Sequence, residues 1–171
     1  MPIKIIKKIL ILSLFYFTFG VINAEENLKS VGKFKDWESF VLSKDGNKTC
    51  FAQSVPVVRA PKKLKRDPSR LFISFRPVEN IKNEISVTNG YEFKLKAPVT
   101  AKSGKKSYNL FSKGRFAWVV DNEDEKKLIV TMKKALRLMV VGNSQNGDQT
   151  TDHYSMMGFT KAYKTAKKNC S

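Results

Sequence analysis

The stretch that decides the fold is residues 34–58, "FKDWESFVLSKDGNKTCFAQSVPVV". A strand-like run at 34–42 is followed by Asp45-Gly46, a pair of residues typical of the turn in a β-hairpin. The run "TCFAQSVP" then predicts the partner strand, with Cys50 early in it. This stretch therefore predicts an antiparallel hairpin that carries a cysteine.

Apolar runs recur along the rest of the chain, and turn residues separate them. In the run that begins "LFISF", Leu71 and Ile73 alternate with Phe72, so both faces of this strand are partly apolar. Several strands in antiparallel order are therefore expected after the first hairpin. Further turns are predicted at Ser103-Gly104, at Lys113-Gly114 and around Asn146-Gly147.

Another hairpin is predicted around "TNG" at residues 88–90. A three-residue loop there would pair Val87 with Tyr91, whereas a two-residue turn would pair Val87 with Glu92. Facing residues should agree in polarity, which favours the longer loop with Gly90 in a left-handed bulge.

Two segments have helical patterns. In "DNEDEKKLIVTMKKA", acids crowd the first turn and lysines the last, and Asp121 or Asn122 can cap the start. The segment "GFTKAYKTAKKN" near the C-terminus has an apolar face at helical spacing and a lysine face opposite. Its apolar residues are Phe159, Ala162, Tyr163 and Ala166, and its lysines are Lys161, Lys164 and Lys168.

About seven or eight short strands with two helices predict a mainly β protein. We expect an antiparallel β-sandwich or flattened barrel, with a short helix near 122–135 and a C-terminal amphipathic helix. Residues 34–171 are predicted to form a single domain, and the polar residues 25–33 a flexible segment before it.

The first 24 residues have the pattern of a secretory signal peptide. Lys4, Lys7 and Lys8 precede fourteen uncharged residues at 9–22, and a small residue, Ala24, stands before the first acid. The alternative is a transmembrane anchor, but a spanning helix needs about 20 apolar residues. We therefore expect cleavage near Ala24 and a mature chain without a transmembrane segment, in the periplasm, at the cell surface or secreted.

Export changes how the two cysteines are interpreted. Disulfides form and persist outside the cytosol, and Cys50 and Cys170 allow one intramolecular pairing. That bond would close a loop of about 120 residues, for which chain entropy gives about 4–5 kcal/mol. The alternatives are an intermolecular bridge or free thiols.

The chain is strongly basic. Its net charge is +17, and it falls to +14 without the three lysines of the leader. A general bias toward lysine is one explanation, and affinity for an anionic envelope or host-surface component is another. Because of export, no nucleic acid is expected as a partner. The alternative for the basic residues between 59 and 70 is a solvated face. The candidate anionic-ligand patch is Arg59, Lys62, Lys63, Lys65, Arg66 and Arg70.

No catalytic, cofactor-binding or metal site is predicted. His153 follows Asp152, with Ser155 nearby, but adjacent strand residues point to opposite faces, so Asp152 cannot easily orient His153. One histidine and two distant cysteines are too few for a zinc site. The chain is therefore expected not to be an enzyme.

The order and spacing of these motifs resemble the invasion associated locus B family of exported alphaproteobacterial proteins. The resemblance covers about residues 34–170. It rests on "DWESFVLSKDGNKTCFAQSVP", "KRDPSRLFISFRPVENIKNEISVTNGYEFK", "LFSKGRFAW" and "LIVTMKKALRLMVVGNSQNGDQTTDHYSMMGFTKAYKTAKKNC". Some branches carry an extra cysteine pair near the third motif, where this chain has Phe111 and Phe116.

The resemblance implies an exported, non-enzymatic binding protein associated with entry into host cells. A different role is also open, that of an envelope-maintenance or stress protein that contacts lipopolysaccharide or outer-membrane components. Surface exposure favours the first role, and protection from protease in intact cells favours the second.

Overall fold

The computed structural model describes residues 27–171. The expected signal peptide at 1–24 lies outside the described residues. The described part contains eleven strands, two α-helices and one 3₁₀ turn, η1. In chain order they are β1 (Asn27–Phe34), β2 (Trp37–Lys44), β3 (Asn47–Ser54), β4 (Val58–Ala60), β5 (Arg70–Arg76), η1 (Pro77–Glu79), β6 (Ile81–Thr88), β7 (Val99–Ser103), β8 (Lys106–Lys113), β9 (Phe116–Trp118), α1 (Asn122–Lys134), β10 (Arg137–Asn143), β11 (Gln149–Ser155) and α2 (Phe159–Asn169).

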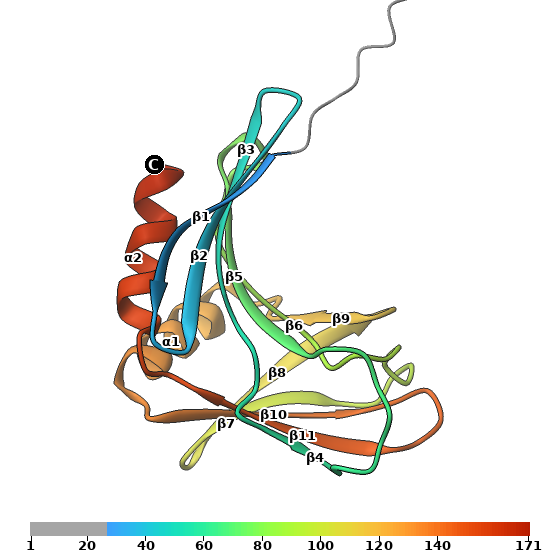
Figure 1. The fold of residues 1–171 in the computed structure, drawn as a ribbon. Helices are drawn as coiled ribbons and strands as arrows, with labels where there is room; N and C mark the ends of the chain where they lie inside the picture. The colour runs from blue at the N-terminus through green and yellow to red at the C-terminus, as the bar shows by residue number, and fades with distance from the viewer. Residues whose placement is uncertain (1–26) are drawn as a thin grey trace, which may run out of the picture.

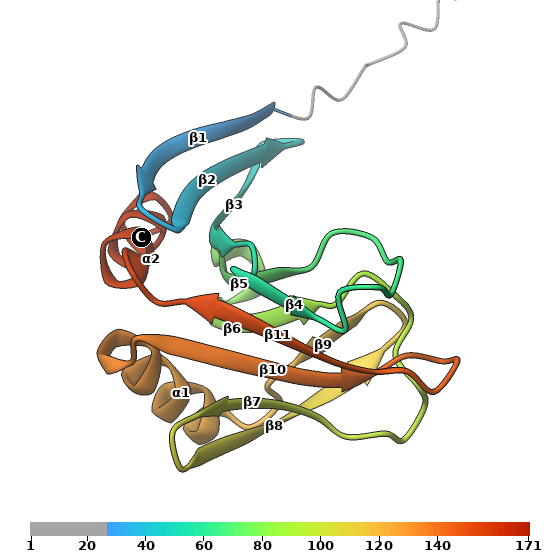
Figure 2. The same cartoon turned by 60° about the horizontal axis from the view of Figure 1, so that its bottom comes forward.

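All eleven strands belong to one antiparallel sheet, in the order β1-β2-β3-β5-β6-β9-β8-β7-β10-β11-β4. The sheet does not close, because β1 and β4 remain its two edges. It bends strongly, so that β1, β2 and β3 stand upright in Figure 1 while β7, β10 and β11 run across the bottom. Figure 2 shows α1 and α2 on the same side of the bend. The prediction of a mainly β, antiparallel fold with two helices is confirmed.

The first hairpin forms where it was predicted. Lys44 pairs with Asn47, which leaves Asp45 and Gly46 as the turn. Both turn residues have positive φ, 50° and 75°, as a type I′ turn requires. The later turns at Gly104 and Gly114 are also present, one residue further along than predicted, since Ser103 pairs with Lys106 and Lys113 with Phe116.

One strand was predicted at 34–42, preceded by a flexible segment at 25–33. In the structure, two strands cover this region from residue 27, so the prediction is wrong there. Residues 27–34 are strand β1, and Lys35 and Asp36 turn the chain into β2, with Phe34 paired with Trp37. The polar sequence of β1 concealed the strand. As an edge strand it leaves most of its residues exposed, so it shows no apolar alternation.

The predicted hairpin at 88–90 is also wrong. β6 pairs with β5 and β9, and Tyr91 does not pair with Val87. Gly90 does have positive φ, 81°, but for another reason: a Cβ there would overlap the carbonyl oxygen of Asp67. The amide of Asp67 donates to the carbonyl of Gly90 at 3.0 Å. The glycine therefore permits a close approach of two backbones rather than a hairpin.

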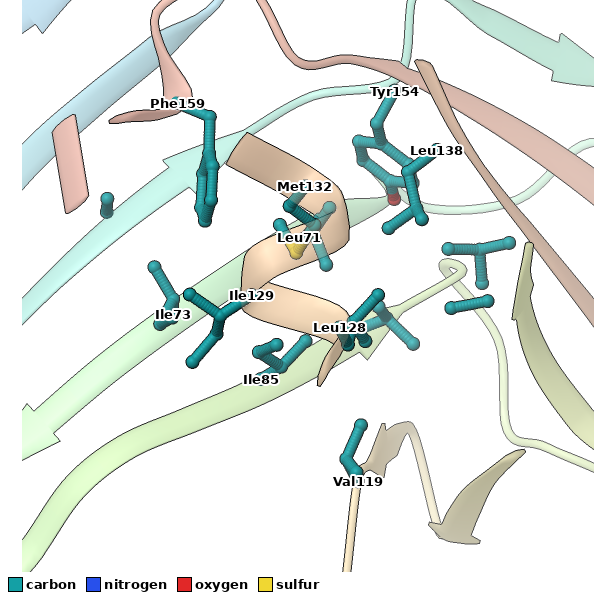
Figure 3. Close-up of a cluster of buried hydrophobic side chains, with 14 of the residues drawn as sticks. Leu71, Ile73, Ile85, Val119, Leu128, Ile129, Met132, Leu138, Tyr154 and Phe159 are labelled. Carbon is teal, nitrogen blue, oxygen red and sulfur yellow. The ribbon is translucent and has the colours of Figure 1, made fainter. Parts of the chain in front are cut away.

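Both predicted helices form, and they cover one face of the sheet, called here the inner face. Asp121 caps α1, since its carboxylate accepts from the amide of Asp124 at 2.8 Å. α2 packs on β2 and β3 with its predicted apolar face buried. Figure 3 shows the core between helices and sheet. Labelled there are Leu71, Ile73, Ile85, Val119, Leu128, Ile129, Met132, Leu138, Tyr154 and Phe159.

A disulfide joins the inner face of β3 to the end of α2. It links Cys50 to Cys170, whose Cα atoms are 5.8 Å apart, and the predicted pairing is therefore present. Close by, the Trp37 indole packs edge-on against Phe159 at 4.8 Å between ring centres and donates to the carbonyl of Ser155 at 2.8 Å. The C-terminal helix is thus attached to the sheet both by packing and covalently.

Candidate binding surfaces

The predicted basic patch is divided by the structure into buried arginine and exposed lysine. Arg66 forms an ion pair with Asp152 of β11, and only 2% and 0% of the two side chains are exposed. Its guanidinium also donates to the carbonyl of Asn89 at 2.6 Å and to Ser69 Oγ at 2.8 Å. Arg66 therefore holds the loop between β4 and β5, called here the basic loop, against β11 and is not part of an exposed surface.

Two other arginines of the patch are partly withdrawn as well. Arg59 lies on β4 and donates to the carbonyl of Asp67 at 2.6 Å, and Arg70 is half-buried at the start of β5. Lys62, Lys63 and Lys65 are exposed. Three of the six predicted residues thus remain as an exposed basic surface.

Polar side chains fill the space beneath this loop. The hydroxyls of Tyr91 and Thr150 lie 2.5 Å apart, and Asn89 donates to Thr150 Oγ1 at 3.2 Å. Burial raises the pKa of Tyr91. Burial also raises the pKa of Tyr154 well above its ordinary value, so both phenols stay neutral.

The His153 and Asp152 side chains lie on opposite faces of β11. Asp152 is fully buried and engaged by Arg66, while His153, the next residue, is half-buried on the other face of β11. This agrees with the alternation expected in a strand. Among residues 27–171, no group of three or more histidine, cysteine or acidic side chains lies together in a way that suits a metal ion.

A different surface stands out on the outer face of the sheet, opposite the helices. Six aromatic side chains from β2, β3, β5, β8 and β9 lie there, half-buried or exposed. We call them the aromatic face: Phe40, Phe51, Phe72, Phe111, Phe116 and Trp118. In the sheet these strands have the order β2-β3-β5-β6-β9-β8, so the rings lie on one face in two groups, one on each side of β6.

Five of the six rings of the aromatic face are in contact within two groups. Phe51 stacks on Phe40 at 5.2 Å between ring centres and meets Phe72 edge-on at 6.1 Å. On the other side of β6, Trp118 meets Phe111 edge-on at 5.4 Å. Such pairs hold each ring in a defined orientation, and therefore the face is preorganised.

Two serines separate these groups and open a cavity. Ser86 of β6 pairs with Phe72 on one side and Trp118 on the other, and Ser74 of β5 pairs with Phe51. Because both serines are small, a cavity of about 530 Å³ lies above them. We call it the slot. Its lining is Phe51, Phe72, Ser74, Arg76, Glu84, Ser86, Lys113, Phe116 and Trp118.

One end of the slot carries charges that largely neutralise each other. Arg76 donates two parallel hydrogen bonds to Glu84, at 3.0 and 2.9 Å, and a third to Glu79 at 3.0 Å. The bond to Glu84 raises the pKa of Arg76. Lys113 is exposed at the same cavity. The slot thus combines aromatic walls, hydroxyl groups and a nearly balanced set of charges.

Sequence reasoning did not find this surface, although one signal was present. Strand β5 has apolar residues on both faces, which a sheet covered on one side does not need. The surface could not be recognised without the strand order. In the sheet β6 is followed by β9 and β8, whereas in the sequence it is followed by β7.

Within residues 27–171, neither helix has the length and apolar character needed to cross a bilayer. The fold is similar to the crystal structure of invasion associated protein B from Bartonella henselae, with a TM-score of 0.56 and 12% sequence identity. The match covers 80% of this chain and 94% of that one. The family resemblance is therefore confirmed at the level of the fold. No protein-family model matches the chain, and no curated protein matches it.

Proposed function

We propose that the chain is an exported, non-enzymatic binding protein of the periplasm or cell surface. The observation that carries this proposal is the aromatic face. Monomeric proteins seldom leave a contiguous apolar surface open unless it meets a partner. Here two of its rings, Phe111 and Phe116, are 55% and 47% exposed. The disulfide is consistent with folding in an oxidising compartment.

The non-enzymatic part of the proposal is supported by the polar groups. The acid next to the single histidine is engaged by Arg66, and the charged residues of the slot, Arg76 and Glu84, neutralise each other. A general base needs a free lone pair within reach of a substrate proton. These contacts favour binding over catalysis.

The biological role that we propose is based on the protein whose fold is similar. We propose a role associated with host-cell invasion, as the name of the Bartonella protein suggests. Maintenance of the envelope by contact with lipopolysaccharide or outer-membrane components is the alternative. Protease treatment of intact cells separates the two, because degradation indicates surface exposure and protection indicates a periplasmic protein.

The binding function is tested by co-sedimentation with insoluble envelope material. The unmodified protein is expected to sediment with it, and Trp118→Ala together with Phe72→Ala is expected to reduce the bound fraction at least fivefold. Leu136→Ala is a matched control, because Leu136 is 83% exposed and lies outside the aromatic face. Equal sedimentation of all three proteins would contradict the proposal.

A second surface, the exposed lysines of the basic loop, is a candidate for an anionic component. Lys62, Lys63 and Lys65 point into solvent in a strongly basic chain. Binding to vesicles with anionic headgroups should weaken when these three are changed to Gln, and should weaken with salt, because exposed charges are screened. The matched control changes Lys161, Lys164 and Lys168 on α2. Equal loss in both variants would show that only net charge matters.

A further inference from the structure

We propose that the slot binds an unbranched, uncharged glycan strand, whose pyranose rings lie between the aromatic walls. This inference rests on the proposed binding function and names the ligand of the same surface. It is carried by the arrangement of rings and hydroxyls around Ser86.

The walls have a separation that suits one ring-shaped residue. Phe72 and Trp118 both face Ser86 in register, so their backbones are two strand spacings apart, about 10 Å. Side chains stand roughly perpendicular to a sheet, so the two rings rise on either side of β6. Their negative π faces attract the C–H groups on the flat face of a sugar, which carry a small positive charge.

The floor of the slot is polar, and this distinguishes a sugar from other apolar ligands. Ser86 and Ser74 present hydroxyls, and the Glu84 carboxylate lies at the end of the slot. A pyranose has apolar faces and a rim of hydroxyl groups, so its faces meet the walls while its rim meets the floor. An acyl chain would leave these hydroxyls without partners, at a cost in free energy.

The charge of the slot favours an uncharged ligand. Arg76 is paired with Glu84 and Glu79, so Lys113 is the one lining cation without an ion pair among residues 27–171. The remaining lining residues are aromatic or hydroxylic. The cavity of about 530 Å³ lies within the range of small-molecule sites, 300–1,000 Å³. A second copy of the chain is disfavoured because both copies carry a large positive charge.

The two tryptophans of the chain provide a site-specific readout. Trp118 lines the slot, whereas Trp37 is 1% exposed and its indole N–H donates to the carbonyl of Ser155. The purified protein with its disulfide intact is titrated with cello-oligosaccharides and with β-1,4-linked N-acetylglucosamine oligosaccharides. We expect the indole N–H signal of Trp118 to shift saturably in NMR spectra while that of Trp37 stays in place.

Two variants with different mechanisms keep this test independent of folding. Trp118→Ala removes one wall, and Ser86→Leu fills the slot while both aromatic walls stay in place. Each is expected to weaken glycan binding about tenfold or more, while a urea titration shows that the fold is retained. Leu42→Ala is the matched control, since Leu42 lies on the outer face of β2 but does not line the slot.

The outcomes separate this inference from the proposed function. A saturable Trp118 shift that Ser86→Leu abolishes, unchanged between low and high salt, supports it. Absence of a Trp118 shift with both oligosaccharide series, or equal shifts of both indoles, overturns it. If oligosaccharides fail but Trp118 and Phe72 still govern sedimentation with envelope material, the ligand class is wrong and the binding function stands. If neither binds, both are wrong.

Discussion

The two faces of strand β5 differ in what covers them. On the inner face, Leu71 and Ile73 are fully buried beneath the helices. On the outer face, Phe72 is half-buried, and it lies at an open cavity. Folding accounts for the apolar residues of the inner face, because their burial drives it. It does not account for the rings of the outer face. Substitutions on the inner face should therefore affect mainly the stability of the protein, and substitutions on the outer face should affect mainly ligand binding.

The basic loop likewise contains both a buried structural residue and exposed residues. Arg66 and Lys65 are neighbours in the sequence, yet Arg66 is buried against Asp152 and Lys65 is exposed. A positive charge in this loop is thus a structural group at one position and a surface group at the next. Charge density in the sequence therefore overestimates the surface available to an anionic ligand.

The largest effect is expected from the covalent link on the inner face. Replacing Cys50 and Cys170 by Ser should lower the free energy of unfolding by about 4–5 kcal/mol, because the unfolded chain gains the entropy of a loop spanning 120 residues. Urea titration of the oxidised protein and the double variant measures the difference. A loss below about 1 kcal/mol would contradict it, and alkylation without reductant verifies that the parent protein has no free thiol.

The difference between buried and exposed charges in the basic loop is tested by substituting the adjacent residues Arg66 and Lys65. Arg66→Gln should destabilise the protein by about 3–5 kcal/mol, because it leaves the Asp152 carboxylate buried without its partner. Lys65→Gln should change stability by no more than about 0.5 kcal/mol. Thermal and urea unfolding of both variants provides the measurement. Similar losses in the two variants would mean that Arg66 is not a structural residue.

Much of the fold was predictable from local patterns in the sequence. The Asp45-Gly46 turn, the acid-rich start of α1 and the apolar face of α2 are each specified within a few residues, and all three formed. The single possible cysteine pairing was predictable for the same reason: it requires counting rather than geometry.

What escaped prediction depends on contacts between distant segments. Strand β1 is polar because it is an edge, and nothing in its own sequence reveals its partner. Gly90 serves a close approach to Asp67, 23 residues earlier, and not a local hairpin. The aromatic face needs the order β2-β3-β5-β6-β9-β8, which joins residues from Phe40 to Trp118. Local periodicity contains none of this information.

The comparison of faces is tested most directly by two adjacent residues of β5. Ile73→Ala should cost about 2–5 kcal/mol, because it creates a cavity in the core. Phe72→Ala removes a partly exposed ring whose edge-on contact with Phe51 is worth about 0.5–1.5 kcal/mol, so it should cost less than Ile73→Ala. Both are measured by urea titration at neutral pH. Equal costs would mean that the outer face is a second core, and that the slot is a packing defect rather than a binding surface.

The smallest effect concerns Glu125, a buried acid of α1. Its carboxylate accepts from the amide of Ile85 on β6 at 2.9 Å. Burial raises the pKa of Glu125, the charge of Glu84 adds to this, and the Ile85 amide opposes it. Since the folded pKa lies above the unfolded value of about 4.3, ionisation opposes folding. The contribution of Glu125 to stability is full below pH 4 and decreases as the pH rises through the folded pKa.

Glu125→Gln keeps an oxygen that can accept from Ile85 but cannot ionise. The free energy of unfolding of the variant, relative to the unmodified protein, should therefore increase from about pH 4 toward pH 7. Urea titrations at several pH values in this range give the difference at each one. A difference that stays constant would show that Glu125 titrates alike in the folded and unfolded chains. A difference that falls with pH would show that the Ile85 amide outweighs burial, and that the inner face stabilises this charge.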